Sequence, residues 1–476
     1  MLKAQRKRTD YTRWFRDVTL MAEVYDYRVL VKGCGVWPGY GFKLRNNVLN
    51  IIKSLLDATG HEECLFPLLI PQSLLAKEGE HIRSFEKEVF WVTKGGETEL
   101  EEKLALRPTS ETVIMPMFKL WIQSHTDLPK KVYQVVSVFR YETKATHPMI
   151  RVREVTMFKE AHTAHATYED AERQVKEAIE IYRKFFEELS IPYVISKRPV
   201  WDKFAGAVYT ISFDTLMPEG RTLQIGTVHN LGQNFSKPFE VEFLKPDGSR
   251  DYVYTTSYGV SERVIAALIS IHGDDHGLLL PPKVAPIQVV IVPIPYKGKE
   301  REVYEASRKL YETLKEVGVR VKLDDRDDVT PGEKFYFWEL KGVPVRVEIG
   351  PKDLEGGTVT LSRRDTLERT RHPVEELEVK VKELFKEIER SLSERSWREF
   401  REHLIYVNTL EEAKELVAKQ EGIIHVAWCG SDDCGLKLES EVQGRVLGTP
   451  LDEKVEGKCV VCGENASYYV RLAKTY

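Results

Sequence analysis

Two short segments of the chain each place one arginine where it could bind a nucleotide phosphate. They are Phe139-Arg140-Tyr141-Glu142 and Gly259-Val260-Ser261-Glu262-Arg263. A guanidinium group is planar and permanently charged, and it grips phosphate oxygens through two parallel charge-assisted hydrogen bonds. Two such groups can hold both ends of a triphosphate, so the pair indicates ATP chemistry. An aromatic-Arg-x-Glu string alone is also typical of a surface ion pair, so the neighbouring motifs must decide.

The residues around Arg140 have the types that would complete a nucleotide site. Arg140 can bind an α-phosphate, and Glu142, one pleat further along, can accept a hydrogen bond from an exocyclic amine or a substrate ammonium. The loop 143–148 can cover the nucleotide, Arg151 adds positive charge, and Phe158 offers a flat apolar face.

Other polar residues gain meaning from their place before and between the two arginines. Thr109, Ser110 and Glu111 bring hydroxyls and a carboxylate into a turn, although such a triplet alone is more typical of a helix N-cap. His162 and His229, each taken singly, are typical of ordinary packed histidines. The order of the whole set favours a binding site.

Four of the six cysteines crowd the end of the chain with the spacing Cys-x4-Cys, 24 residues, Cys-x2-Cys. Two thiolate pairs on tight turns can form a closed, structural four-sulfur zinc site. The alternatives are four unrelated buried thiols or two disulfides. The candidate ligands are Cys429, Cys434, Cys459 and Cys462, whereas Cys34 and Cys64 are isolated and are expected to be buried apolar groups.

Hydrophobic periodicity predicts the elements that must position these residues. Most of the first 280 or so residues reads as an antiparallel sheet with helices packed on it. Helices are expected at 40–57 and 168–189, and strands at 64–70, 131–142, 150–160, 193–196, 207–213 and 223–228. Pro67 lies inside the first of these strands, and since proline cannot donate to a ladder, that strand should lie at an edge or an oligomer interface.

After Pro281-Pro282 the pattern changes to alternating strands and helices, which predicts a small α/β domain. Strands are expected at 289–293, 319–323 and 343–349, helices at 300–317 and 334–340, and a charged helix at 374–402 leads into the cysteine-bearing tail. The fold class is therefore α+β with three domains, at 1–283, 284–380 and 381–476.

Composition limits the partners. The chain has 476 residues, 42% of them hydrophobic, and a net charge of −4, so any nucleic-acid contact must come from local basic patches. No stretch approaches the roughly 18 apolar residues of a membrane span, and the start MLKAQRKRTD lacks the apolar core of a secretion signal. A cytoplasmic protein with no membrane and no DNA partner is expected.

The ordered strings resemble the three motifs of class II aminoacyl-tRNA synthetases, with motif 1 ending near Pro67, motif 2 at 139–160 and motif 3 at 259–263. The finer pattern resembles the prolyl-tRNA synthetase family of the archaeal and eukaryotic type. The strings that carry this resemblance are Arg107-Pro108-Thr109-Ser110-Glu111, Phe158-Lys159-Glu160-Ala161-His162-Thr163 and 224–235 (QIGTVHNLGQNF). An α/β anticodon-binding domain, a four-cysteine tail and a terminal tyrosine that tucks toward the catalytic domain complete it.

The resemblance implies two adjoining subsites, with Arg140 and Arg263 as the catalytic groups. ATP with Mg²⁺ would bind to Arg140, Glu142, Arg151, Gln224, Thr227 and Arg263. Proline would bind to Thr109, Glu111, Arg140, Phe158, Glu160, His162, His229 and Ser257. Phe158 could serve the amino-acid pocket or stack on adenine. For the anticodon of tRNA(Pro), Lys334, Glu339, Arg346 and Glu348 are candidates, although core packing explains about half of that cluster equally well.

The implied reaction forms prolyl-adenylate from L-proline and ATP and then transfers proline to the 3′-OH of the terminal adenosine of tRNA(Pro). A small apolar pocket discriminates weakly against alanine or cysteine, and too few residues separate motifs 2 and 3 for an inserted editing domain. We therefore expect misactivation without correction in cis. Pro67 and the family resemblance also favour a homodimer.

Two other functions compete. A threonyl enzyme would need a zinc-binding cysteine in its substrate pocket, and there is no cysteine between Cys64 and Cys429. A catalytically silent paralogue would have no use for both arginines. Proline-dependent exchange of pyrophosphate with ATP separates these hypotheses.

Overall fold

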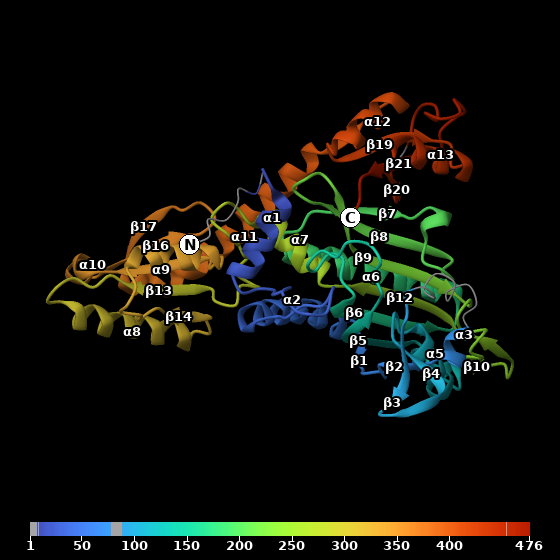
Figure 1. Cartoon of the computed structure of the whole chain (residues 1–476), viewed down its shortest axis with the longest axis horizontal. Coiled ribbons are helices and arrows are strands. Elements are labelled where there is room, and N and C mark those ends of the chain that lie inside the picture. Colours follow the sequence, from blue (N-terminus) through green and yellow to red (C-terminus); the bar gives the residue numbers. More distant parts are fainter. Residues whose placement is uncertain (1–6, 8, 78–87, 454) are drawn as a thin grey trace.

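The computed structural model, which describes residues 7, 9–77, 88–453 and 455–476, shows three packed bodies (Figure 1). The largest carries the long central strands, the α/β body extends to the left in Figure 1, and the C-terminal body lies at the top. Helices α1 (Tyr11–Met21), α2 (Gly39–Asp57) and α11 (Leu377–Glu402) lie where the first two bodies meet.

A single sheet runs through the first and the last body. Its strand order in the described residues is β1-β5-β6-β12-β9-β8-β7-β20-β21-β19-β18. All neighbours are antiparallel except β1 with β5 and β19 with β18. The bounds are β1 (Glu62–Glu63), β5 (Lys130–Phe139), β6 (Glu154–His165), β7 (Val194–Lys197), β8 (Tyr209–Leu216), β9 (Thr222–Gly232), β12 (Tyr254–Val260), β18 (Leu404–Tyr406), β19 (Ile423–Trp428), β20 (Arg445–Pro450) and β21 (Tyr468–Ala473).

The pairing of β7 with β20 joins the two bodies. Ser196 and Lys197 of β7 lie opposite Pro450 and Thr449 of β20. The sequence predicts a strand at 193–196 and a separate C-terminal domain, but not that the two would share a sheet.

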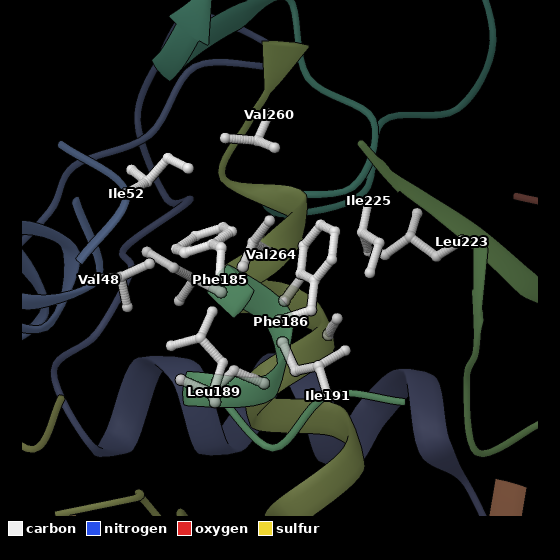
Figure 2. Close-up of a cluster of buried hydrophobic side chains, with 14 of the residues drawn as sticks. Val48, Ile52, Phe185, Phe186, Leu189, Ile191, Leu223, Ile225, Val260 and Val264 are labelled. Atoms are coloured by element: carbon white, nitrogen blue, oxygen red, sulfur yellow. The ribbon is translucent and has the colours of Figure 1, made fainter. Parts of the chain in front are cut away.

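Helix α6 (Tyr168–Glu188) covers one face of the central sheet. It begins after Thr167, whose hydroxyl accepts from the backbone N–H of Asp170, an N-cap that satisfies an otherwise unpaired donor. Its apolar stripe enters a core shared with α2, β9 and α7 (Arg263–His272), and Figure 2 shows Phe185 and Phe186 among these side chains. The predicted helices at 40–57 and 168–189 are therefore confirmed.

Alternation along β6 assigns the two faces of the sheet. The buried Lys159 points toward the helices, because its Nζ donates to the hydroxyl of Tyr182 on α6 at 2.9 Å. Successive side chains of a strand point to opposite faces. Phe158, Glu160 and His162 therefore face away from α6.

The predicted strand at 64–70 is wrong. The chain forms two short strands instead, β1 and β2 (Leu69–Pro71), with Pro67 in the segment between them. A proline cannot donate to a ladder, and here the backbone around it bonds to side chains: Phe66 N donates to the amide of Gln134, and Arg107 donates to the carbonyls of Phe66 and Pro67.

The other differences concern short or local elements. The strand expected at 150–160 begins only at Glu154, because His147 and Arg151 pair in a turn. Elements in the first body that were not predicted are α1, α3 (Gln72–Ala76), β3 (Phe90–Gly95), β4 (Thr98–Leu106), α5 (Glu111–Trp121), η1 (His125–Asp127), η2 (Val200–Asp202), β10 (Glu242–Leu244), β11 (Arg250–Tyr252), β12 and α7. Strands β2, β4 and β3 form a separate small sheet.

The α/β body has a five-stranded sheet in the order β14-β13-β15-β16-β17. Its first three strands are parallel, and two antiparallel strands follow them. The bounds are β13 (Val289–Pro293), α8 (Glu300–Glu316), β14 (Val321–Leu323), α9 (Pro331–Leu340), β15 (Val345–Ile349), α10 (Pro351–Gly356), β16 (Thr358–Arg363), β17 (Arg369–Pro373) and η3 (Val374–Glu376).

Helix α11 belongs to two bodies. Leu377, Val381, Ile388 and Leu392 pack into the core of the α/β body, whereas Phe400 packs with β7 and β20. The C-terminal body adds α12 (Leu410–Lys419) and α13 (Asp432–Val442). We keep the domain limits 1–283, 284–380 and 381–476 as a proposal, and the second of them falls inside α11. None of the helices in the described ranges combines the length and apolarity that a membrane span requires.

Candidate active site

Every residue predicted for the ATP and proline subsites lines one cavity of about 370 Å³ on the face of the sheet opposite α6. The set comprises Thr109, Glu111, Arg140, Glu142, Arg151, Phe158, Glu160, His162, Gln224, Thr227, His229, Ser257 and Arg263. They come from segments far apart in the sequence, so the sheet brings them together.

Strand register explains how the polar side chains reach the same place. His162 on β6 lies opposite Ser257 on β12, and Ser257 lies opposite His229 on β9. Two residues further along each strand, Glu160 lies opposite Gly259, and Gly259 lies opposite Thr227. Two rows of residues therefore cross three neighbouring strands on one face. Any side chain in place of Gly259 would crowd the ring of Phe158, since a Cβ there would lie 3.3 Å from that ring. The absence of a side chain at Gly259 therefore leaves space for the Phe158 ring.

Three guanidinium groups make one end of the cavity strongly positive. Arg140 directly follows β5, Arg151 lies in the returning segment, and Arg263 begins α7. Burial, together with the charges of Arg140 and Arg151, lowers the pKa of Arg263 to about 10. Like charges are costly to hold together without a counter-charge, and the N-terminus of α7 adds a favourable dipole. This end of the cavity is suited to a polyanion.

Glu262, which sequence reasoning did not single out, ties motif 3 to motif 2. Its Oε2 accepts from Thr156 N at 2.8 Å, from Thr156 Oγ1 at 2.9 Å and from Met157 N at 3.0 Å. Burial raises the pKa of Glu262 to about 7. Because Arg263 is the next residue, these bonds fix its backbone against β6. The acidic residue beside Arg263 was the available signal, but only the fold shows what it contacts.

Buried polar groups line the other end of the cavity. Ser110 stands at the N-cap position of α5 yet makes no capping bond, because its hydroxyl donates to Glu160 Oε1. Thr109 likewise donates to Glu111. His162 Nε2 lies 3.1 Å from Glu160 Oε2. The hydroxyls of Thr109 and Ser110 therefore bond to carboxylates that line the cavity rather than to the helix end.

The charges of this end support one another. Burial alone would raise the pKa of Glu160, but bonds from His162, Ser110 and Gln134 hold it below its usual value. Burial opposes the charge on His162 as well, yet Glu160 and Glu111 raise its pKa. Two carboxylates facing one imidazole leave a net negative charge whether or not the imidazole is protonated, and a substrate ammonium can balance it.

Phe204 and Thr210 also line the cavity and were not predicted. The ring of Phe204 lies 4.5 Å from the ring of His229, centroid to centroid. Thr210 Oγ1 lies 2.9 Å from His229 Nδ1 and accepts from Phe204 N at the same distance. Phe204 is in a loop after η2, and only the pairing of β8 with β9 places that loop beside His229.

The four late cysteines also meet. Their sulfur atoms all lie within 4.8 Å of one another, and all six cysteines, each within the described ranges, are free thiols. Cys429 follows β19 and Cys434 lies in α13, while Cys459 and Cys462 share a turn closed by Gly463, whose φ of +77° favours glycine. Four sulfurs this close could hold a metal ion.

The anticodon candidates are only partly brought together. Arg346 donates to Glu339 Oε1 at 2.9 Å and to Glu348 Oε1 at 3.0 Å, and it stacks 3.9 Å from the ring of Phe335. Lys334 lies apart, because its buried Nζ donates to the carbonyl of Asp324 at 3.0 Å.

Comparison with known proteins agrees with this geometry. Residues 90–272 match the family "tRNA synthetase class II core domain (G, H, P, S and T)", residues 288–384 match "Anticodon binding domain" and residues 410–476 match "Prolyl-tRNA synthetase, C-terminal". The proline-tRNA ligase of Ignicoccus hospitalis is 57% identical over 476 residues, which cover 99% of both chains. The chain belongs to the prolyl-tRNA synthetase family. The proline-tRNA ligase of Metallosphaera sedula is also 57% identical, over 98% of both chains.

A solved structure extends the likeness to three dimensions. Giardia lamblia prolyl-tRNA synthetase in complex with prolyl-adenylate matches with a TM-score of 0.96 at 36% identity, over 99% of this chain and all of the other. In the present member of the prolyl-tRNA synthetase family, the terminal Tyr476 bonds to the first body, as the resemblance implies. Its N–H donates to Thr222 O at 3.2 Å, its hydroxyl donates to Glu219, and its ring lies 5.8 Å from that of His147.

Proposed function

We propose that the chain activates L-proline with ATP and then transfers the prolyl group to tRNA(Pro). In the first step a carboxylate oxygen of proline attacks the α-phosphorus, and pyrophosphate leaves. In the second step the 3′-OH of the terminal adenosine attacks the prolyl carbonyl, and AMP leaves. The observation that carries the proposal is the single cavity that joins three guanidinium groups to a buried acidic pocket.

The ATP subsite is proposed at the positive end of this cavity. Arg140 would bind the α-phosphate and the attacking carboxylate, Arg263 the γ-phosphate, and Glu142 the amine of adenine. Gln224 and Thr227 would line the ribose and the base, and Arg151 adds charge. Mg²⁺ bound to the phosphates would neutralise further charge. Displacement at phosphorus requires positioning and charge neutralisation more than proton transfer, so we assign no general base.

The proline subsite is proposed at the acidic end. Thr109 and Glu111 would receive the secondary ammonium of proline. Phe158, His229 and Ser257 would enclose the ring together with Glu160 and His162, and we add Phe204 because its ring packs against that of His229. The ring of Phe158 lies beside Gly259. This position fits either proposed role, in the amino-acid pocket or stacked on adenine.

The transfer step can be tested with tRNA(Pro) transcripts and radiolabelled proline. We expect ATP-dependent charging of the intact transcript and none of a transcript that ends in 3′-deoxyadenosine. A silent paralogue would charge neither transcript, while an enzyme for another amino acid would leave proline unused.

Editing in cis is not expected. Between β6 and β12 the chain forms α6, η2 and β7 to β11, and most of these elements belong to the central sheet or its core, which leaves no segment for a hydrolytic domain. A small pocket discriminates only weakly against alanine or cysteine. Purified protein should therefore leave alanyl-tRNA(Pro) intact over the time of spontaneous hydrolysis. Faster deacylation, followed as release of labelled alanine, would contradict this prediction.

We propose a structural zinc ion at the four cysteines, since four thiolates fill a tetrahedral site and leave no open position. Cys459→Ser should lower the zinc content, measured by elemental analysis, and the midpoint of thermal unfolding. Proline-dependent exchange should persist in the folded fraction. Cys64→Ser, at a cysteine outside the cluster, is the control and should retain the metal. Loss of exchange in a variant that has lost its zinc but stays folded would overturn the purely structural role.

The remaining partners rest on the family and on exposed surfaces. We propose that Glu339, Arg346 and Glu348, with Lys334 at a distance, contact the anticodon loop. We also propose a homodimer through the exposed apolar side chains of Leu65, Leu68 and Leu69 beside Pro67, which sedimentation analysis would reveal as twice the monomer mass. A cytoplasmic location would follow from a role in translation.

A further inference from the structure

A buried amide links the acidic pocket to the backbone just before Pro67. Gln134 lies on β5 directly opposite Glu160 on β6, and its side chain is fully buried. Its Nε2 donates to Glu160 Oε1 and to Ser110 Oγ, both at 2.9 Å, while its Oε1 accepts from Phe66 N at 3.0 Å. Both amide hydrogens and the amide oxygen are therefore used, which determines the orientation of the group.

The point to which Gln134 is anchored is itself fixed. The carbonyl of Phe66 accepts from Arg107 Nη1 at 2.7 Å, and Arg107 Nε donates to Ser137 O at 2.9 Å. Phe66 is therefore held at both its backbone N–H and its carbonyl, and its side chain is buried in an apolar cluster. An amide bonded to such a backbone can hold a carboxylate in one position.

Both oxygens of the carboxylate that Gln134 holds already accept hydrogen bonds. Ser110 and Gln134 donate to Oε1 of Glu160, and His162 bonds to Oε2. His162 in turn places Nδ1 4.0 Å from Glu111 Oε1, and this buried Nδ1 makes no hydrogen bond to any described residue. Glu160 is thus suited to orienting His162 rather than to receiving the substrate ammonium, which leaves that role to Glu111.

We propose that Gln134 is a positioning residue that sets the affinity for proline. It anchors the carboxylate of Glu160 to the backbone of Phe66. Through Glu160 it also holds the ring of His162 in position relative to Glu111. The inference rests on the proposed function, because it concerns the proline subsite of that reaction. It assigns no contact between Gln134 and the substrate.

Gln134→Leu removes the donor to Glu160 while preserving much of the side-chain volume. A hydrogen bond to a charged group contributes enough for its loss to weaken binding by about 10- to 100-fold. We therefore expect KM for proline to rise by this factor, with KM for ATP and kcat within about threefold of wild type. Proline and ATP titrations of pyrophosphate exchange measure the split.

Gln134→Glu distinguishes loss of the hydrogen bond to Glu160 from a general loss of packing. The new carboxyl can still accept from Phe66 N, but it can donate to Glu160 only when protonated. The ratio of its KM for proline to that of wild type should therefore fall as the pH is lowered from about 8 to about 6. The ratio for Gln134→Leu should stay constant over that range, because leucine does not titrate.

Gln174→Leu is the matched control. Gln174 is also a buried glutamine, but it lies on α6 and donates to Tyr258 and Glu177 on the other side of the sheet. It should lower thermal stability and leave KM for proline unchanged. Equal rises in KM for proline in the two leucine variants, or a pH-independent ratio for Gln134→Glu, would overturn the inference. If Gln134→Leu is recovered unfolded, the glutamate variant decides. Absence of proline-dependent exchange in wild type would instead overturn the proposed function.

Discussion

Arg140→Ala is expected to lower kcat/KM for proline-dependent pyrophosphate exchange by about 10³-fold or more. Groups that stabilise charge in the transition state of phosphoryl transfer contribute effects of this size. Arg140 is proposed to bridge the α-phosphate and the attacking carboxylate, so its loss affects both reactants. Burial lowers its pKa from the ordinary arginine value, and the nearby carboxylates Glu88, Glu111 and Glu160 favour its charge. Exchange assays over a range of ATP and proline concentrations measure the effect.

Two further variants sharpen this prediction. Arg140→Lys keeps the charge but not the planar fork, so it should recover only part of the lost rate. Arg173→Ala removes an exposed arginine of α6 that pairs with Asp170, and it should behave as wild type. Arg140→Ala with a rate within tenfold of wild type, in folded protein, would show that Arg140 does not contact the reacting groups.

Glu111→Gln should raise KM for proline by about 10²- to 10³-fold. Glu111 is buried and is proposed to pair with the secondary ammonium, and removing one member of a buried charge pair is strongly destabilising because the other charge is left uncompensated. KM for ATP should stay within about threefold, since the guanidinium groups are untouched. Titration of each substrate in the exchange assay separates the two constants.

An exposed carboxylate supplies the comparison for this variant. Glu101→Gln, on β4 at the surface, should leave both constants unchanged. If Glu111→Gln raised KM for ATP as much as KM for proline, the division of the cavity into a positive and an acidic subsite would be wrong.

The family resemblance predicted most residues of the candidate site, and local strand geometry agrees with it. Phe158, Glu160 and His162 alternate along β6, so period-two geometry alone places them on one face. Cysteine spacing likewise predicted that Cys429 and Cys459 would meet, and the structure places all four sulfurs within 4.8 Å of one another. Such features depend on residues that are close in sequence, or on the meeting of only two short segments.

Non-local contacts explain what the sequence did not reveal. Phe204 reaches the cavity only because β8 pairs with β9, and no residue near it shows that pairing. A strand pattern identifies β7 but neither β20 nor its pairing with β7, since register and partner depend on the whole sheet. At Pro67, apolar composition favoured a strand where side chains of Gln134 and Arg107 in fact satisfy the backbone. Lys334 carries a charge typical of nucleic-acid contact, and only the structure shows that its Nζ also donates to the carbonyl of Asp324.

Pyrophosphate exchange of the purified wild-type chain with each amino acid in turn tests the central claim most directly. The account predicts ATP-dependent exchange with proline, weaker exchange with alanine or cysteine, and none with threonine. Folded protein that binds ATP yet shows no exchange with proline would contradict it.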